Sequence, residues 1–212
     1  MSAAAAAPPA GAMPPAPSCF SEWLSRTPLV CKSAILLTTV PSLLSMLFGF
    51  SGALLLFPRS IFYGQVWRFV TAPFVQGDFI GVLFCAVVFA IQTPPSELRV
   101  GSLAFFLHLA ISSAIINVIF VLAAGALSTL PWVPLTNFLL VPGNGAWPVL
   151  IMMLSERALA DPAGSTPFCC FSIPNPFFGW ALALFFSLFA FFPMLDMFIA
   201  VGIAHARESR GV

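Results

Sequence analysis

Charge is what this sequence has least of. Only 7% of its 212 residues are Asp, Glu, Lys or Arg, whereas about a quarter of a soluble domain is charged. Eight basic residues face seven acidic ones, and the net charge of +1 leaves no basic surface to hold nucleic-acid phosphates. These numbers exclude a soluble globular enzyme, a disordered scaffold and a nucleic-acid-binding protein.

Metal-binding and disulfide patterns are also missing. The five cysteines have neither the spacing of metal ligands nor that of a disulfide framework, and Cys85, inside an apolar run, is typical of a small buried residue. We therefore expect no metal, no cofactor and no small-molecule substrate.

What the chain does have is apolar sequence. Hydrophobic residues make up 60% of it, 24 residues are Phe, and the mean hydropathy is +1.03. This composition predicts an all-α, polytopic membrane protein. We expect residues 1–21 to form a disordered Ala/Pro-rich tail, residues 22–206 a single transmembrane domain, and residues 207–212 a short cytosolic tail.

The charged residues mark the ends of the apolar runs, and a helix needs about 20 residues to cross a bilayer. Between the first two runs, residues 59–78 mix polar side chains with phenylalanines, which favours a loop at the membrane interface. The first four predicted spans are residues 33–58, 79–93, 101–127 and 137–155.

Residues 177–205 can form either one long helix or two short ones divided at Pro193. With two helices, only Arg59 and Arg68 lie outside and the other basic residues are cytosolic; with one helix, Arg207 and Arg210 move outside and the two sides balance. The positive-inside rule therefore favours six spans with both termini in the cytosol. Two helices fit in so few residues only if the bundle is thin on that side.

Four short motifs follow one another along these segments. They are Trp67-Arg68-Phe69-Val70-Thr71, Glu97-Leu98-Arg99-Val100-Gly101, Pro142-Gly143-Asn144-Gly145-Ala146, and Gly202-Ile203-Ala204-His205-Ala206. In this order and with these span lengths, they resemble the rhomboid-like superfamily over residues 22–209. The resemblance implies a six-helix rhomboid-like bundle.

The start of the first span narrows the resemblance. Residues 23–29 and 40–44 are similar to the rhomboid-like proteins of the endoplasmic reticulum (ER) that carry a ubiquitin-associated domain, and more distantly to derlins. The sequence shows no such domain before Val212, so we do not expect it to bind ubiquitin. The resemblance implies ER residence, contact with membrane lipid, and binding of membrane-protein clients and of degradation machinery.

Rhomboid proteases use a serine in a Gly-x-Ser-Gly turn and a histidine on the last span. The corresponding positions are Ala146, whose methyl group cannot attack a carbonyl, and Ile199. Ser155 lies at the other end of the fourth span, and His205 is more than a turn too late. We therefore expect no catalytic residues and no enzyme activity. A divergent intramembrane serine protease and a small transporter remain as alternatives.

The remaining candidates have structural or client-contact roles. Trp67 and Arg68 either anchor the first loop at the interface or pack it onto the bundle, and Asp196 either caps the last helix or is a functional carboxylate. Gly202 and Ala206 share a face that permits close helix packing, most simply against the fourth span, and Ala200 and Ala204 form a second such pair. The full candidate set is Trp67, Arg68, Glu97, Gly101, Gly145, Asp196, Gly202 and Ala206.

Overall fold

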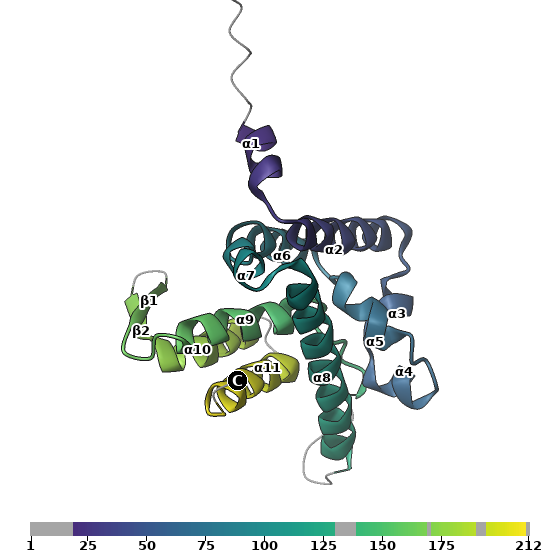
Figure 1. Cartoon of the computed structure of the whole chain (residues 1–212). Helices are drawn as coiled ribbons and strands as arrows, with labels where there is room; N and C mark the ends of the chain where they lie inside the picture. Colours follow the sequence, from purple (N-terminus) through teal and green to yellow (C-terminus); the bar gives the residue numbers. More distant parts are fainter. Residues whose placement is uncertain (1–18, 130–138, 169–170, 190–193, 211–212) are drawn as a thin grey trace, which may run out of the picture.

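A computed structural model of the protein describes residues 19–129, 139–168, 171–189 and 194–210. The described part is mostly helical (Figure 1). Most of the predicted tail lies outside the described residues. A short amphipathic helix, α1 (Cys19–Arg26), includes its last three residues.

The first long helix, α2 (Leu29–Phe48), starts and stops earlier than the predicted run 33–58. It follows Pro28 and stops at Gly49, whose φ of 71° is left-handed and therefore favours glycine. Pro41 lies inside the helix without ending it.

The last part of the predicted first span contains a separate short helix, α3 (Ser51–Leu54). The segment predicted to be an interfacial loop, residues 59–78, is built largely from short helices. These are α4 (Pro58–Phe62), α5 (Arg68–Thr71) and the 3₁₀ helix η1 (Ala72–Phe74). Helix α6 (Phe79–Ile91) then follows the predicted second span, and Asp78 caps it by accepting the Gly81 N–H at 2.6 Å. The expected turn after α6 is a further short helix, α7 (Pro94–Val100).

The third predicted span is confirmed as α8 (Ser102–Ser128). The fourth starts later than predicted, because α9 runs over Trp147–Leu159. Residues 137 and 138 lie outside the described residues, and those from 139 to 146 form a turn and loop that contains Pro142 and the left-handed Gly145 (φ 61°).

The last stretch forms two helices, α10 (Asn175–Phe189) and α11 (Leu195–Glu208). The predicted break at Pro193 lies outside the described residues. Between α9 and α10 the structure has a feature that the sequence analysis missed, the antiparallel pair β1 (Ser165–Phe168) and β2 (Phe171–Pro174). Its register places Ser165 opposite Pro174.

Helix lengths bear directly on the number of spans. Among the described residues, α2 and α8 are long and apolar enough to cross a membrane, and α6 passes the same test only together with α5 and η1, from which it is bent by 81°. Helices α9, α10 and α11 have 13, 15 and 14 residues. At 1.5 Å per residue they are about 20 Å long, against about 30 Å of hydrocarbon. The six-span topology therefore stays a prediction.

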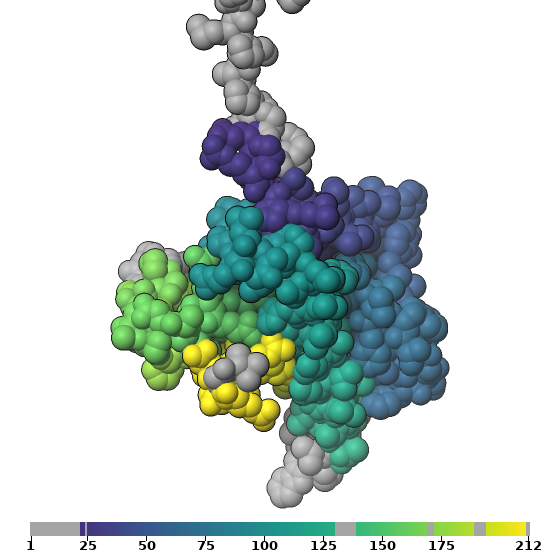
Figure 2. All heavy atoms as spheres, viewed as in Figure 1, coloured from purple at the N-terminus to yellow at the C-terminus, as the bar shows by residue number. Residues whose placement is uncertain are grey.

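Helix α8 runs between two groups of elements, with α2 to α5 on one side and α9 to α11 on the other (Figures 1 and 2). The core centres on α9, where Leu150, Ile151 and Met152 are fully buried. Helices α8, α10 and α11 all pack against α9. Three aromatic side chains pack together between α6, α9 and α10. The centroid of the Trp147 ring lies 4.0 Å from that of Phe84 and 4.4 Å from that of Phe186.

Candidate functional site

The loop before α9 carries the position at which the rhomboid resemblance expects a serine. Ala146 occupies it and is buried. With the Gln76 amide oriented so that both of its groups are bonded, its oxygen accepts the Ala146 N–H at 2.9 Å and its nitrogen donates to the Asn144 carbonyl at 3.2 Å. The backbone N–H of Ala146 is therefore already used in a hydrogen bond within the protein.

Gly145 is required by the close approach of this loop to the segment after η1. Its φ of +61° disfavours any L-residue, and a Cβ at this position would lie 2.6 Å from the Val75 carbonyl oxygen and 2.5 Å from the Gln76 amide. The sequence marked Gly145 as a motif residue, but only the structure shows that it lets the two loops touch.

Asp196 ties the same loop to α11. Its two carboxylate oxygens accept the backbone and side-chain N–H groups of Asn144, both at 2.8 Å, and Oδ1 also accepts the Met197 N–H at 3.0 Å. The predicted N-cap role is therefore not what the structure shows: Asp196 is the second residue of α11, Met194 holds the N-cap position, and the main partner lies 52 residues earlier.

The other residues considered for catalysis are engaged in apolar packing or in hydrogen bonds to backbone carbonyls. Ile199 packs against buried apolar residues of α8 and α9. Ser155 Oγ donates to the Ile151 carbonyl at 2.7 Å. His205 lies between the Val201 and Pro176 carbonyl oxygens, each 3.0 Å from one ring nitrogen.

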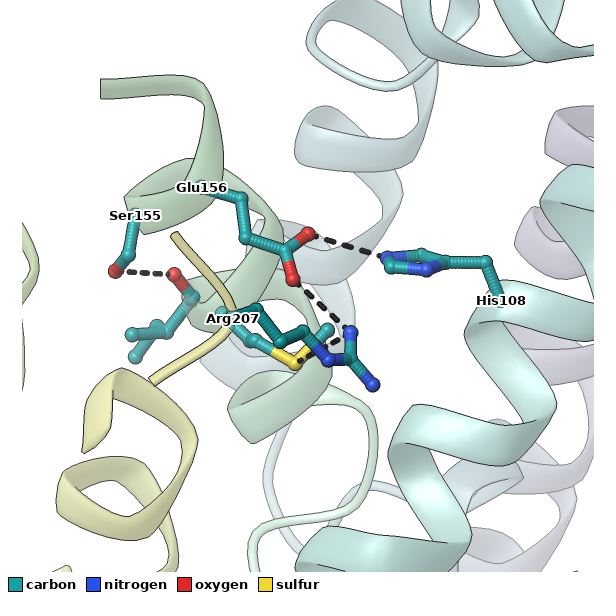
Figure 3. Close-up of polar contacts among 6 residues, drawn as sticks. His108, Ser155, Glu156 and Arg207 are labelled. Carbon is teal, nitrogen blue, oxygen red and sulfur yellow. Dashed lines mark hydrogen bonds and ion pairs between the residues drawn. The ribbon is translucent and has the colours of Figure 1, made fainter. Parts of the chain in front are cut away.

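A polar cluster at the end of α9 joins three helices (Figure 3). The Glu156 carboxylate lies 3.1 Å from His108 Nε2 of α8 and 3.0 Å from Arg207 Nη1 of α11. Ser155, although adjacent in sequence, points away from His108. The cluster thus holds helix ends together and does not assemble a serine–histidine pair.

In the first loop, Arg68 and Trp67 play different parts. Arg68 is 5% exposed; its guanidinium donates to the Gly52 carbonyl at 2.8 Å, to the Leu55 carbonyl and, through Nε, to Gln65 Oε1 at 2.7 Å. Trp67 is 52% exposed. Packing of the loop therefore rests on Arg68, and Trp67 faces outward.

Glu97 bonds the starts of two helices, α2 and α8. It is 1% exposed and accepts the Val30 and Cys31 N–H groups at 2.9 and 2.8 Å, in the first turn of α2, and the Ser102 hydroxyl at 2.6 Å, at the start of α8. Burial raises the pKa of Glu97, but these hydrogen bonds together outweigh it and hold the pKa below its ordinary value. Gly101, with φ +87°, supplies the turn between α7 and α8.

The expected close packing through Gly202 and Ala206 is not found. A Cβ on Gly202 would meet open space, and Ala206 is exposed. Ala200 and Ala204 are fully buried instead and pack with Val149 and Met152 of α9. Helix α11 therefore packs on α9 through a pair of small residues, as expected, but the pair is Ala200 and Ala204 instead of Gly202 and Ala206.

Two further polar residues of α8, Asn117 and His108, have partners on other elements. Asn117 donates to the Phe69 carbonyl at 3.4 Å, and His108 lies partly exposed beside Glu156. Gln76, Asn144 and Glu156 were not singled out by sequence; of these, Asn144 lay inside a quoted motif. Within the part of the chain that the structure describes, no group of three His, Cys, Asp or Glu side chains is placed to hold a metal ion.

The fold and the site define a helical membrane protein in which a loop before a short central helix is tied to the start of the last helix. Residues 63–205, more than half of the chain, match the Rhomboid domain. The chain therefore belongs to the rhomboid family. No curated protein and no solved structure matches it.

Proposed function

We propose that this chain is a non-catalytic member of the rhomboid family that binds other membrane proteins in the ER and takes part in their retention, quality control or degradation. One observation carries the proposal: the serine position is Ala146, buried beside an amide that Gln76 already occupies. Without a nucleophile and with this N–H engaged, neither acyl transfer nor oxyanion stabilisation is available at that position.

Short helices supply a mechanism. A bundle whose α9, α10 and α11 are about 20 Å long is shorter than the hydrocarbon core. The bilayer then thins locally, at fractions of a kcal/mol per Å of mismatch. Thinner hydrocarbon lowers the barrier to moving polar client segments along or through the membrane.

Helices α6 and α10 offer the client-contact surface. Large apolar side chains lie exposed along one face of each, at Leu83 and Val87 of α6 and at Leu184 and Leu188 of α10. The rings of Phe84 of α6 and Phe186 of α10 both pack against the ring of Trp147. A client span lying along α6 and α10 would bury apolar side chains without exposing backbone polar groups to lipid.

Site-specific photo-crosslinking in cells tests client binding. A photoreactive amino acid at Leu83 and another at Leu184 should capture membrane proteins, while one at Leu103 of α8, equally apolar and exposed, serves as the matched control. Recovery of lipid adducts alone from the first two positions would remove the proposal. Co-fractionation of the chain with ER membranes tests the location.

A fluorophosphonate probe tests the divergent-protease alternative. We expect no labelling, because Ser155 Oγ is hydrogen-bonded to the Ile151 carbonyl and points away from His108, while both ring nitrogens of His205 lie 3.0 Å from backbone carbonyl oxygens. Labelling that disappears in Ser155→Ala would establish a serine nucleophile and overturn the non-catalytic assignment.

A further inference from the structure

A cavity of about 300 Å³ lies between α2, α8 and the segment formed by α5 and η1. Phe89, Ala146 and Val149 line it and are buried, so they form its floor. Leu37 and Val70 line it and are exposed, so they belong to its rim. The cavity therefore runs from the surface of the bundle down to the alanine that stands in the rhomboid serine position.

The lining offers little to a polar ligand. Apart from three hydroxyl residues it is aliphatic or aromatic. The Ser33 hydroxyl donates back to the Val30 carbonyl at 2.9 Å, and the Thr38 hydroxyl to the Ala34 carbonyl at 2.8 Å. Both of these hydroxyls bond within α2, which leaves Ser113 as the one other polar side chain of the lining. The cavity therefore suits a mainly apolar ligand.

The size of the cavity favours a thin ligand over a helix. One turn of α-helix with side chains, about 10 Å across and 5.4 Å long, occupies about 400 Å³, against about 300 Å³ for the cavity. The lining residues of α2 extend from Val30 to Thr38, about 12 Å at 1.5 Å per residue. A lining of this length fits an extended run of methylene groups.

The surroundings of the cavity supply such a chain. Helices α2 and α8, which flank it, are the two described helices that are each long and apolar enough to cross a membrane. The exposed Ala110 and Ala114 of α8 leave the entrance open toward the side where hydrocarbon lies. Apolar walls without partner atoms lose their dispersion contacts, so an empty cavity here is unfavourable.

We propose that this cavity binds one acyl chain of a membrane phospholipid, with the end of the chain against Ala146 and Val149. The proposal does not depend on client binding. It gives the serine-free position a use, since an alanine methyl completes an apolar floor on which a hydroxyl would need a hydrogen-bond partner.

The test uses the full chain in phosphatidylcholine vesicles that contain a phosphatidylcholine with a diazirine in one acyl chain. After photolysis, mass spectrometry should find lipid adducts on the peptide containing Ala146 and Val149, besides adducts on Leu122, an exposed residue of α8 that reports surface lipid. Absence of adducts at the floor would overturn the proposal.

Two variants of α8 sharpen the result. Ala114→Phe places a ring in the cavity and should lower floor adducts roughly fivefold relative to those on Leu122, because the ring takes the volume of the chain. Ala104→Phe, on the same helix but outside the cavity, is the matched control and should change nothing. Ala110→Leu replaces the first variant if Ala114→Phe does not fold.

Equal floor labelling in the wild type and in a folded cavity variant would mean surface lipid only and would overturn the site. A second arm adds a photoreactive single-span peptide to the same vesicles. Peptide adducts in place of lipid adducts at Ala146 and Val149 would assign the cavity to a client side chain and likewise overturn the proposal.

Discussion

Asn144 and Asp196 face each other in a two-point contact, in which one carboxylate accepts both the backbone and the side-chain N–H groups of the asparagine at 2.8 Å. The contact joins the loop before α9 to the first turn of α11, and Asp196 is 2% exposed. A buried carboxylate is stable in such a place only when hydrogen bonds replace the water it has lost. The pair therefore fixes how the two helices start relative to each other.

Asp196→Ala should lower the stability of the bundle by about 2–4 kcal/mol, because two donors of the partly buried Asn144 lose their buried acceptor. Thermal unfolding in detergent, followed by loss of helical circular dichroism, measures the effect. The exchange variant Asn144→Asp with Asp196→Asn keeps a side-chain pair and should recover part of the loss. No recovery, or no loss in the single variant, would contradict this role.

Gly145→Ala should destabilise the chain more than Gly143→Ala. At Gly145 the left-handed backbone alone costs an L-residue about 1–2 kcal/mol, and the new Cβ would lie 2.6 Å from the Val75 carbonyl oxygen. At Gly143 the nearest atom, Leu56 Cβ, is 3.5 Å away, which is an ordinary contact. Equal midpoints of thermal unfolding for these two variants would show that the loop can move aside.

A feature of this fold could be predicted from the sequence when residues close together along the chain determine it. Helices α6 and α8 were predicted well, since long charge-free runs with polar ends determine them. The late start of α9 was missed because Asn144 is held by Asp196, a contact between residues far apart in sequence. Likewise, Gly202 and Ala206 have the right spacing for packing, but only the position of α9 decides that Ala200 and Ala204 face it.

The hairpin was missed for a similar reason. Its strands are only four residues each, and they are supported by contacts made after folding, in which Thr166 donates to Asn175 Oδ1 at 2.7 Å and Asn175 Nδ2 donates to the Asp161 carbonyl at 2.6 Å. For Arg68, the sequence left open whether the side chain anchors the first loop at the membrane interface or packs it onto the bundle. Its hydrogen bonds to the backbone carbonyls of residues 52 and 55 favour packing of the loop.

The contribution of Glu97 to stability should depend on pH. Because its hydrogen bonds hold the pKa of Glu97 below the ordinary 4.5, its stabilising effect is fully present above that value and is lost as pH falls through the lower pKa of the folded state. The unfolding midpoint of Glu97→Gln should therefore lie well below that of the wild type at pH 7, and the gap should narrow below pH of about 4.

Glu22→Gln is the control for this comparison. Glu22 pairs with Arg26 on the exposed surface of α1, where an ion pair contributes about 0–1 kcal/mol. Its unfolding midpoint should stay close to that of the wild type across the same range. A gap between Glu97→Gln and the wild type that is independent of pH would mean that the side chain acts through shape rather than charge.

Topology is the last prediction, because the proposed function assumes it. With six spans, the end of α11 lies in the cytosol together with Arg207 and Arg210, as the positive-inside rule requires. In a background with the five native cysteines replaced by serine, a cysteine at Ser209, which is exposed, should resist an impermeant maleimide in sealed ER-derived vesicles of known orientation only when the cytosolic face is inside. A cysteine at Tyr63, also exposed, should show the opposite pattern, since the first loop is then lumenal. If both cysteines react from the same side, an even number of spans follows Tyr63 instead of the five that six spans require. Helices α10 and α11 are then not two separate spans, and the thin bundle proposed for client binding fails as well.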